Sequence, residues 1–389
     1  MVSIFFLLIL ILLLILNLFK ILEIKKNYII SLFITLFIVS FTLNLSSCLK
    51  AVLEGATLWF NSILPTVLPF TFLCNLLMAH DGIFLFSTIL GPILCRPLGL
   101  SKNCSFPLAA SLLCGYPLGA KYSSDLYKLN YITKDEYIRV LNIASNCSPI
   151  FILGTVSISM LNNSFYGYIL LFSNYISIFI IGLITKRKKS HLKTKDIGFK
   201  CEQNFAEAIK SSLESSINTT ISIGGFIIIF SLLISLIKDN VYINIIFQKI
   251  DLFLGLDKNI LHSFFLGSIE ITNGCNLISK APINISLKLA IISFFCSFSG
   301  ISIISQVSSF ISSNKVSVFK YSLLKTLQGL ISFVLTYILS EFFITSIETS
   351  NSINVISKPL IYTLLLPFFL MLLLYIIVKI IYNLLLHFS

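Results

Sequence analysis

The chain has 389 residues, of which 56% are hydrophobic and 11% are charged. Soluble globular proteins carry about 25% charged residues, so this balance excludes a soluble domain and predicts an all-α polytopic membrane protein. The formal net charge of +12 is better explained by basic cytoplasmic loops than by nucleic-acid binding. We therefore expect the protein to lie in a lipid bilayer and to bind no nucleic acid.

A membrane-spanning helix needs about 20 consecutive apolar residues. We expect spans at 2–19, 28–46, 58–79, 138–160, 165–185, 217–237, 283–311, 322–343 and 359–380. The first of these lacks a basic start and a small-residue cleavage site, so we interpret it as an uncleaved span. The segments 82–98 and 241–255 are shorter and apolar on one side, which predicts helices that lie in the membrane interface.

Two apolar segments are interrupted too early to be ordinary spans. Gly115, Pro117 and Gly119 break the segment 104–125, and Asn273-Gly274 breaks the segment 260–280. Broken backbone at membrane depth is tolerated only where it is buried in protein or lines a wet cavity. We therefore expect two re-entrant hairpins, each of which enters and leaves by one face.

The distribution of basic residues predicts the topology. If both hairpins are re-entrant, 21 of the 28 lysines and arginines lie on one side, including Lys315, Lys320 and Lys325. Cytoplasmic loops are enriched in Lys and Arg, so this side is expected to be the cytoplasm. The N-terminus is then outside and the C-terminus cytoplasmic. The segment 186–216 begins Lys-Arg-Lys-Lys and predicts a cytoplasmic loop followed by a short amphipathic helix, which either anchors the topology or binds anionic lipid.

The order of elements occurs twice along the chain. Leu98–Asn103 recurs as Leu254–Asn259, and the hairpins and broken spans follow at similar offsets. We expect two inverted repeats, each with an interfacial helix, a re-entrant hairpin and a broken transmembrane helix, which is a pattern typical of secondary transporters. The expected domains are scaffold helices in 1–48, repeat 1 in 49–185 (hairpin 104–125, broken helix 138–160), a basic loop and amphipathic helix in 186–216, repeat 2 in 217–345 (hairpin 260–280, broken helix 283–311) and a C-terminal helix in 346–389.

Four motifs occur in order over roughly residues 50–345. They are Cys114–Lys121 with Ser124-Asp125, Asn146–Pro149, Glu270–Gly274, and Ser297–Ser302 with Gln306. Together they resemble the YlbJ (SpoVV) sporulation integral membrane proteins, which carry the gate or nucleoside-recognition domain and are similar to the concentrative nucleoside transporters. The resemblance implies a protein of the outer forespore membrane, associated with moving dipicolinic acid from the mother cell towards the forespore. The first hairpin tip has Gly-Tyr-Pro where the nucleoside transporters have Gln-Thr-Glu, so their nucleoside and sodium ligands are not carried over.

Two charged residues are candidates for binding a small anionic substrate. Lys121 lies one helical turn beyond the first break and either pairs with a ligand carboxylate or forms an i,i+4 pair with Asp125. Glu270 is an acidic residue within an apolar stretch, where ionisable groups are costly and are usually functional. It either takes a coupling proton, binds a cation or pairs with Lys121, or it braces its hairpin through Thr272 and Asn273.

The remaining candidates are polar residues and glycines at the breaks. Glycine allows the backbone to approach a ligand closely, and the N-termini of half-helices attract anions. The polar groups of Ser and Asn either replace the hydration shell of a ligand or ion, or hydrogen-bond neighbouring helices to one another. The predicted substrate-binding residues are Gly115, Tyr116, Gly119, Lys121, Asn146, Ser148, Glu270, Thr272, Asn273, Ser299, Ser302 and Gln306.

The sequence contains none of the common catalytic or phosphate-binding motifs. We therefore expect no enzyme, no catalytic residue, no metal site and no cofactor. The coupling ion, proton or sodium, and a homo-oligomeric state are left open. The leading hypothesis is export of dipicolinate during sporulation. The alternatives are a non-transporting spore-envelope assembly factor with a degenerate gate fold, and a transporter of a nucleoside or another small metabolite.

Overall fold

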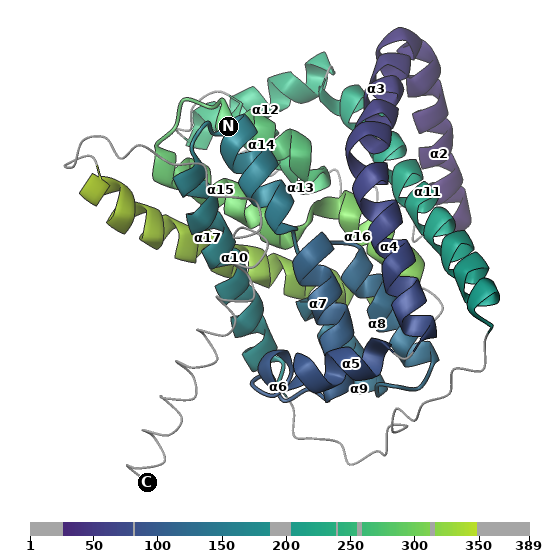
Figure 1. Cartoon of the computed structure of the whole chain (residues 1–389). Coiled ribbons are helices and arrows are strands. Elements are labelled where there is room, and N and C mark those ends of the chain that lie inside the picture. The colour runs from purple at the N-terminus through teal and green to yellow at the C-terminus, as the bar shows by residue number, and fades with distance from the viewer. Residues whose placement is uncertain are drawn as a thin grey trace.

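The structure is a computed structural model that describes residues 26–80, 82–186, 204–238, 240–254, 259–311 and 316–347. Every element in these ranges is a helix, which confirms the all-α class (Figure 1). Four of the helices are long and apolar enough to cross a membrane, and the number rises to six if each of two sharply bent helix pairs is counted as one span. The predicted spans 2–19 and 359–380 lie outside the described residues.

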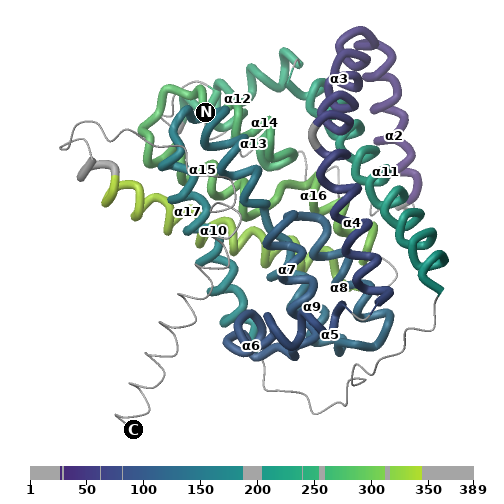
Figure 2. Tube along the Cα trace, in the orientation of Figure 1, coloured from purple at the N-terminus to yellow at the C-terminus, as the bar shows by residue number. Residues whose placement is uncertain are grey.

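The first described helices form one side of the molecule, next to α11 (Figure 2). These are α2 (Lys26–Leu43), α3 (Leu45–Leu58), the π-helical turn η1 (Trp59–Ile63) and α4 (Leu64–Ala79). The chain is helical without interruption from α3 to α4. Trp59 joins this side to α11 (Phe205–Lys238), because its indole N–H donates to the Thr220 carbonyl at 3.0 Å and its ring packs on Gly224.

The first predicted hairpin is present. After the short helices α5 (Gly82–Ile89), α6 (Gly91–Leu94) and η2 (Lys102–Cys104), the antiparallel pair α7 (Ser105–Cys114) and α8 (Leu118–Lys128) packs together. Gly115 takes a φ of +78° at the turn, a conformation that side chains larger than hydrogen disfavour. Re-entry of this hairpin into a bilayer remains a prediction.

The first broken span also forms as expected. Helix α9 (Lys134–Ile143) starts at a capping box between Thr133 and Glu136 and ends before an irregular segment, residues 144–148. The π-helix η3 (Phe151–Met160) and then α10 (Ser164–Ile184) follow it. The interruption lies directly before Pro149, because the residue that precedes a proline disfavours the helical conformation.

The second half repeats this order of elements, although the inversion of the two halves in a membrane remains a prediction. Its helices are α11, α12 (Val241–Leu254), α13 (Ile260–Ile269), α14 (Ile271–Ser279), α15 (Ile285–Phe298), α16 (Gly300–Ile311) and α17 (Val318–Ile347). The break between α15 and α16 lies at Ser299 and Gly300, both with positive φ. The short amphipathic helix expected before residue 217 is not a separate element, because α11 is one continuous helix of 34 residues.

Each hairpin packs on the broken helix of the other half. Helix α8 contacts α16, and α14 contacts η3. Two hydrogen bonds join the first hairpin to the broken span of the second half: the Ser124 hydroxyl donates to the Phe310 carbonyl at 3.0 Å, and the Tyr116 hydroxyl donates to the Cys296 carbonyl at 3.2 Å. The two hairpin tips and the two helix breaks are consequently held near one another in the interior.

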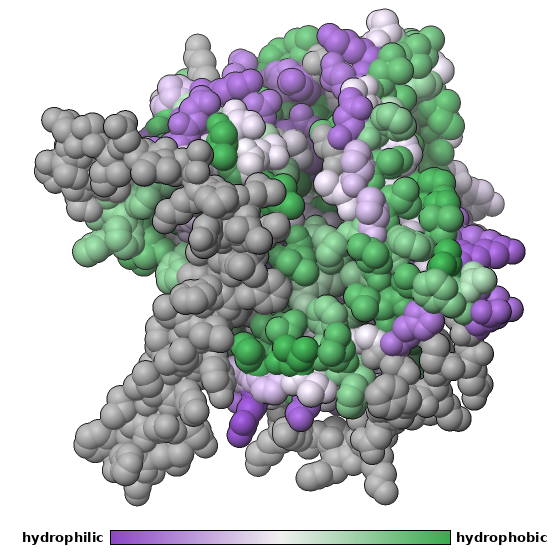
Figure 3. All heavy atoms as spheres, viewed as in Figure 1, coloured by the Kyte–Doolittle hydropathy of each residue, from purple (hydrophilic) through white to green (hydrophobic). Residues whose placement is uncertain are grey.

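The outer surface is strongly apolar. Large hydrophobic side chains are exposed along α2, α11 and α17, among them Phe33, Ile221 and Phe342. Figure 3 shows a broad area of hydrophobic residues across the middle of one face, with hydrophilic residues gathered near its top and its lower right edge. Such a surface is stable where lipid covers it, because contact of apolar side chains with hydrocarbon avoids the free-energy cost of exposing them to water.

Candidate substrate cavity between the two hairpins

A cavity of about 630 Å³ lies where the hairpin tips and the helix breaks meet. Its inner wall combines residues from the first tip, the first break, the second hairpin and α16. These residues are Cys114, Tyr116, Pro117, Cys147, Ser148, Glu270, Thr272, Asn273, Ser302 and Gln306. Most of the remaining wall comes from α3, α4 and α11. Residues from both hairpins and from both broken spans therefore line one partly open cavity.

The rim of the cavity is charged. Lys50 and Glu54 from α3 and Lys238 from the end of α11 contribute to the wall, and all three side chains are exposed. Both lysines belong to the minority of basic residues that the topology prediction assigns to the outer side. The cavity is thus open at the end of the molecule that carries the predicted outer charges.

The first hairpin tip contributes an aromatic ring and close backbone packing. Tyr116 is half-buried and lines the cavity. Gly115 and Gly119 are buried packing positions: a Cβ on Gly115 would lie 2.6 Å from the Ser148 nitrogen, and one on Gly119 would lie 1.7 Å from the Ala144 carbonyl oxygen. Both glycines therefore allow the hairpin to touch the irregular segment 144–148, which a larger residue would push away.

Lys121 has partners within its own half of the molecule. The side chain is buried, and its ammonium donates to Asn75 Oδ1 at 2.9 Å and pairs with Asp125 Oδ2 at 3.3 Å. It also lies 4.6 Å from the centre of the Tyr122 ring. The i,i+4 alternative is thus the arrangement present, and the alternative in which Lys121 pairs with Glu270 is not realised in this structure.

Glu270 lies between α13 and α14 and caps the second of these helices. Its carboxylate accepts from the Thr272 and Asn273 backbone N–H groups and from Asn273 Nδ2, each at 2.9 Å. Helix α14 consequently starts at Ile271, so the expected position of the break at Asn273-Gly274 is wrong and the break lies at Glu270. The bracing role is therefore realised, while the half-buried carboxylate still lines the cavity.

The polar residues at the breaks differ in position. Ser148, Ser302 and Gln306 line the cavity, whereas Asn146 is buried behind it. Among the described residues, neither the amide oxygen nor the amide nitrogen of Gln306 has a hydrogen-bond partner, although the side chain is 1% exposed. A buried amide without a partner costs about 1–3 kcal/mol, so Gln306 is the wall residue most in need of a polar ligand.

Ser299 is also buried, and its hydroxyl has no partner within the described ranges. Its φ of +81° belongs to the left-handed region, which is uncommon for a serine. It lies at the second break, next to the cavity residues of α16, but does not contribute to the cavity wall.

Sequence reasoning missed the most buried charge near the site. Lys325 of α17 is fully buried and binds the irregular segment 144–148, with Gln328 as a neighbour on the same helix. The topology prediction counts Lys325 among the basic residues of cytoplasmic loops, but the side chain is buried within the protein and not in a loop. The position of a lysine within the predicted span 322–343 was the available signal, since ionisable residues at membrane depth are usually functional.

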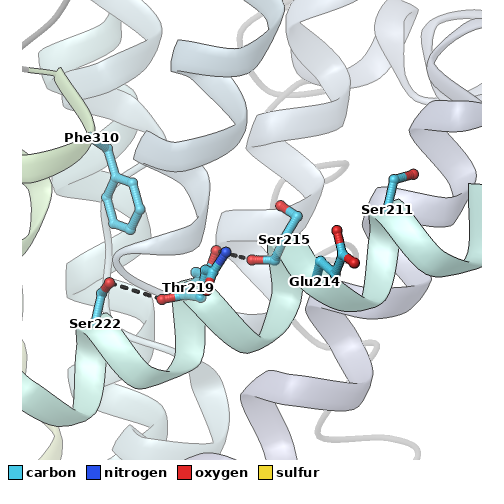
Figure 4. Close-up of a pocket in the computed structure, with 7 residues that line it drawn as sticks. Ser211, Glu214, Ser215, Thr219, Ser222 and Phe310 are labelled. Atoms are coloured by element: carbon cyan, nitrogen blue, oxygen red, sulfur yellow. Dashed lines mark hydrogen bonds between the residues drawn. The ribbon is translucent and has the colours of Figure 1, made fainter.

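A second, more open hollow follows α11 towards its N-terminal end. It measures about 450 Å³ and is lined by Ser211, Glu214, Ser215, Asn218, Thr219, Ser222 and Phe310. Figure 4 shows these polar side chains along one side of α11 and the Phe310 ring across from them on α16. The cavity wall continues along the same two helices, through Ile223 of α11 and Gln306 of α16. The hollow and the cavity are therefore neighbours along one pair of helices.

The fold and the site together define a multi-pass integral membrane protein, all-helical in the part described, with an internal cavity at broken helices that is lined by both polar and apolar residues. The chain is similar to the sporulation integral membrane protein YlbJ of Bacillus subtilis (strain 168), with 26% identity over 344 residues that cover 78% of this chain and 82% of the relative. This confirms the resemblance to the YlbJ proteins that the motifs indicated.

No protein-family model matches the chain. Among solved structures, the chain is similar to CNTnw in an outward-facing state, with a TM-score of 0.44, 15% identity, and coverage of 78% of this chain and 86% of that one.

Proposed function

We propose that this protein is a secondary transporter that moves dipicolinate from the mother-cell cytoplasm across the outer forespore membrane. The observation that carries the proposal is the cavity of about 630 Å³ lined by both hairpin tips and both helix breaks. Ligand sites measure about 300–1,000 Å³, so this volume suits a single aromatic ring with two carboxylates. The similarity to a sporulation membrane protein supports the setting.

An anion would bind at the first hairpin tip. Helix α8 starts at Leu118 next to the cavity residue Pro117, and no side chain caps it. An uncapped helix N-terminus presents backbone N–H groups and positive potential, which stabilise an anion by about 0.3–1 kcal/mol or more when desolvated. The Tyr116 ring offers a flat apolar face for an aromatic ligand. Lys121 takes no part in this site, because it is bound to Asn75 and Asp125.

Glu270 would couple transport to a cation. Its carboxylate already caps α14, so this second helix end is not available to an anion. A dianion and an ionised Glu270 in one cavity repel each other, and this repulsion is relieved if Glu270 takes a proton or binds sodium. Substrate binding would then draw the coupling ion into the cavity.

The route to the opposite side would follow α11. The hollow around Glu214 and Asn218 and the cavity are successive along α11 and α16, and Phe310 lines the hollow one helical turn beyond Gln306 of the cavity wall. In the proposed cycle, this part of α16 closes the cavity from the hollow, and its displacement opens the other side. Movement of one repeat against the other is the usual basis of alternating access.

The test is uptake of labelled dipicolinate by proteoliposomes that contain the full chain, compared with empty liposomes, with and without a proton or sodium gradient. Accumulation above the empty control supports transport, and loss of gradient dependence in Glu270→Gln supports the coupling role. The matched control is Glu54→Gln, which alters an exposed carboxylate at the rim of the same cavity.

Uptake no faster than in empty liposomes would contradict the proposal and favour the assembly-factor alternative. A rise in thermal unfolding midpoint with a nucleoside but not with dipicolinate would favour the third hypothesis.

A further inference from the structure

A buried lysine side chain lies against the first helix break. Lys325 of α17 is fully buried, and its ammonium donates to the Ser145 carbonyl, to Gln328 Oε1 at 2.7 Å and to Asn146 Oδ1 at 3.4 Å. All three acceptors are neutral oxygen atoms. The charge is thus solvated by a set of oxygens rather than neutralised by a carboxylate among these partners.

Further hydrogen bonds orient these oxygens towards the ammonium. Gln328 Nε2 donates to Asn146 Oδ1 at 3.2 Å and to Ser177 Oγ at 3.4 Å, which leaves Gln328 Oε1 to face Lys325. Asn146 Nδ2 donates to the Ile143 carbonyl, so its oxygen also points inward. The Ser145 hydroxyl is bonded to the Tyr321 hydroxyl at 2.6 Å. The site is therefore built by α9, α10 and α17 around the irregular segment.

The interrupted helix at residues 144–148 exposes backbone carbonyls that can bind a cation. Interrupting a helix leaves backbone carbonyls without intrahelical partners, and the Ser145 carbonyl is one of these. In secondary transporters, the carbonyls of unwound helices coordinate sodium ions or protons. A buried ammonium without a carboxylate is costly, and a neutral apolar residue would avoid that cost. The oxygen partners of Lys325 at this point are the groups that would stabilise such a charge.

We propose that the interruption between α9 and η3 is a monovalent-cation site whose resident cation is the Lys325 ammonium. The protein then needs no free ion at this break, and a free ion can bind there only if the lysine side chain is removed. Lys325 and its oxygen partners Ser145, Asn146 and Gln328 do not line the cavity. The inference does not depend on transport activity, because cation binding is measured on the purified chain.

The experiment measures the thermal unfolding midpoint of the purified full-length protein in detergent. Lys325→Ala is compared with wild type in sodium, potassium, ammonium and methylammonium chloride, with choline chloride keeping the ionic strength constant. Lys320→Ala is the matched control, because Lys320 lies on the same helix and is exposed. Lys325→Met is the volume control, because the methionine side chain fills the space of the lysine side chain without carrying a charge.

We expect at least one small cation to raise the midpoint of Lys325→Ala by about 5 °C once it is in large excess over its Kd, while choline does not. Wild type, Lys320→Ala and Lys325→Met should respond alike to all the salts. An equal response of Lys325→Ala to choline and to the small cations would overturn the proposal.

If Lys325→Ala does not fold in choline, recovery of folded protein by purification in ammonium or sodium supports the site. Failure in every salt, together with wild-type stability of Lys325→Met, would show that the break needs no cation and would also overturn the proposal.

Discussion

Replacing Gly119 by alanine tests the contact on which the cavity depends. The new Cβ would lie 1.7 Å from the Ala144 carbonyl oxygen and 2.7 Å from Ser111 Cβ, so it would collide with the irregular segment on one side and with α7 on the other. Since real Cβ atoms essentially never approach closer than 3.0 Å, α8 or the segment must move by at least about 1.3 Å, the difference between 3.0 and 1.7 Å. Such a shift would also displace the neighbouring tip residue Tyr116.

The cost follows from two opposing effects. Overpacking of a well-packed interior costs about 1–3 kcal/mol, and the upper end applies because backbone atoms are in the way. Alanine recovers up to about 1 kcal/mol of helix propensity over glycine. We therefore expect a net loss of about 2 kcal/mol in the free energy of unfolding, seen as a thermal midpoint lowered by several degrees.

The control is Gly225→Ala in α11, where a Cβ would meet nothing within 4 Å. It should raise stability by about 0.5–1 kcal/mol, because only the propensity term remains. Both variants are compared by thermal unfolding of the purified protein in detergent and by dipicolinate uptake. A Gly119→Ala protein as stable as Gly225→Ala would refute the close approach of α8 to the segment 144–148.

Three further changes test the assigned roles. Glu270→Gln should lower the free energy of unfolding by about 1–2 kcal/mol in denaturation assays, because a neutral amide caps α14 less well than a carboxylate; unchanged stability would contradict the cap. Tyr116→Phe should cost about 1 kcal/mol through loss of the bond to the Cys296 carbonyl, and an unaltered unfolding midpoint would show that this bond contributes nothing. Lys121→Met should leave the apparent affinity for dipicolinate unchanged in uptake assays, since the ammonium is bound to Asp125, and a weakened affinity would return Lys121 to the substrate site.

The sequence by itself determined the class and the positions of most of the breaks, whereas the break in the second hairpin lies at Glu270 and not at Asn273-Gly274. Low charge content and long apolar segments specify a membrane protein, because the bilayer admits helices that satisfy their own backbone. Gly115, Pro117 and Pro149 mark interruptions that the structure contains, because these residues act on local backbone conformation. Local chemistry of this kind can be read without knowing the tertiary fold.

Only the tertiary structure decided which polar residues share a site. The sequence allowed Lys121 to pair either with Asp125 or with a ligand. The structure decides for Asp125, because Asn75 of α4 also binds the Lys121 ammonium. Lys325 could not be distinguished from a cytoplasmic lysine by charge counting, because its partner Ser145 is 180 residues away in the chain. Side-chain partners at such separations are selected by packing between helices, for which one sequence carries no periodic signal.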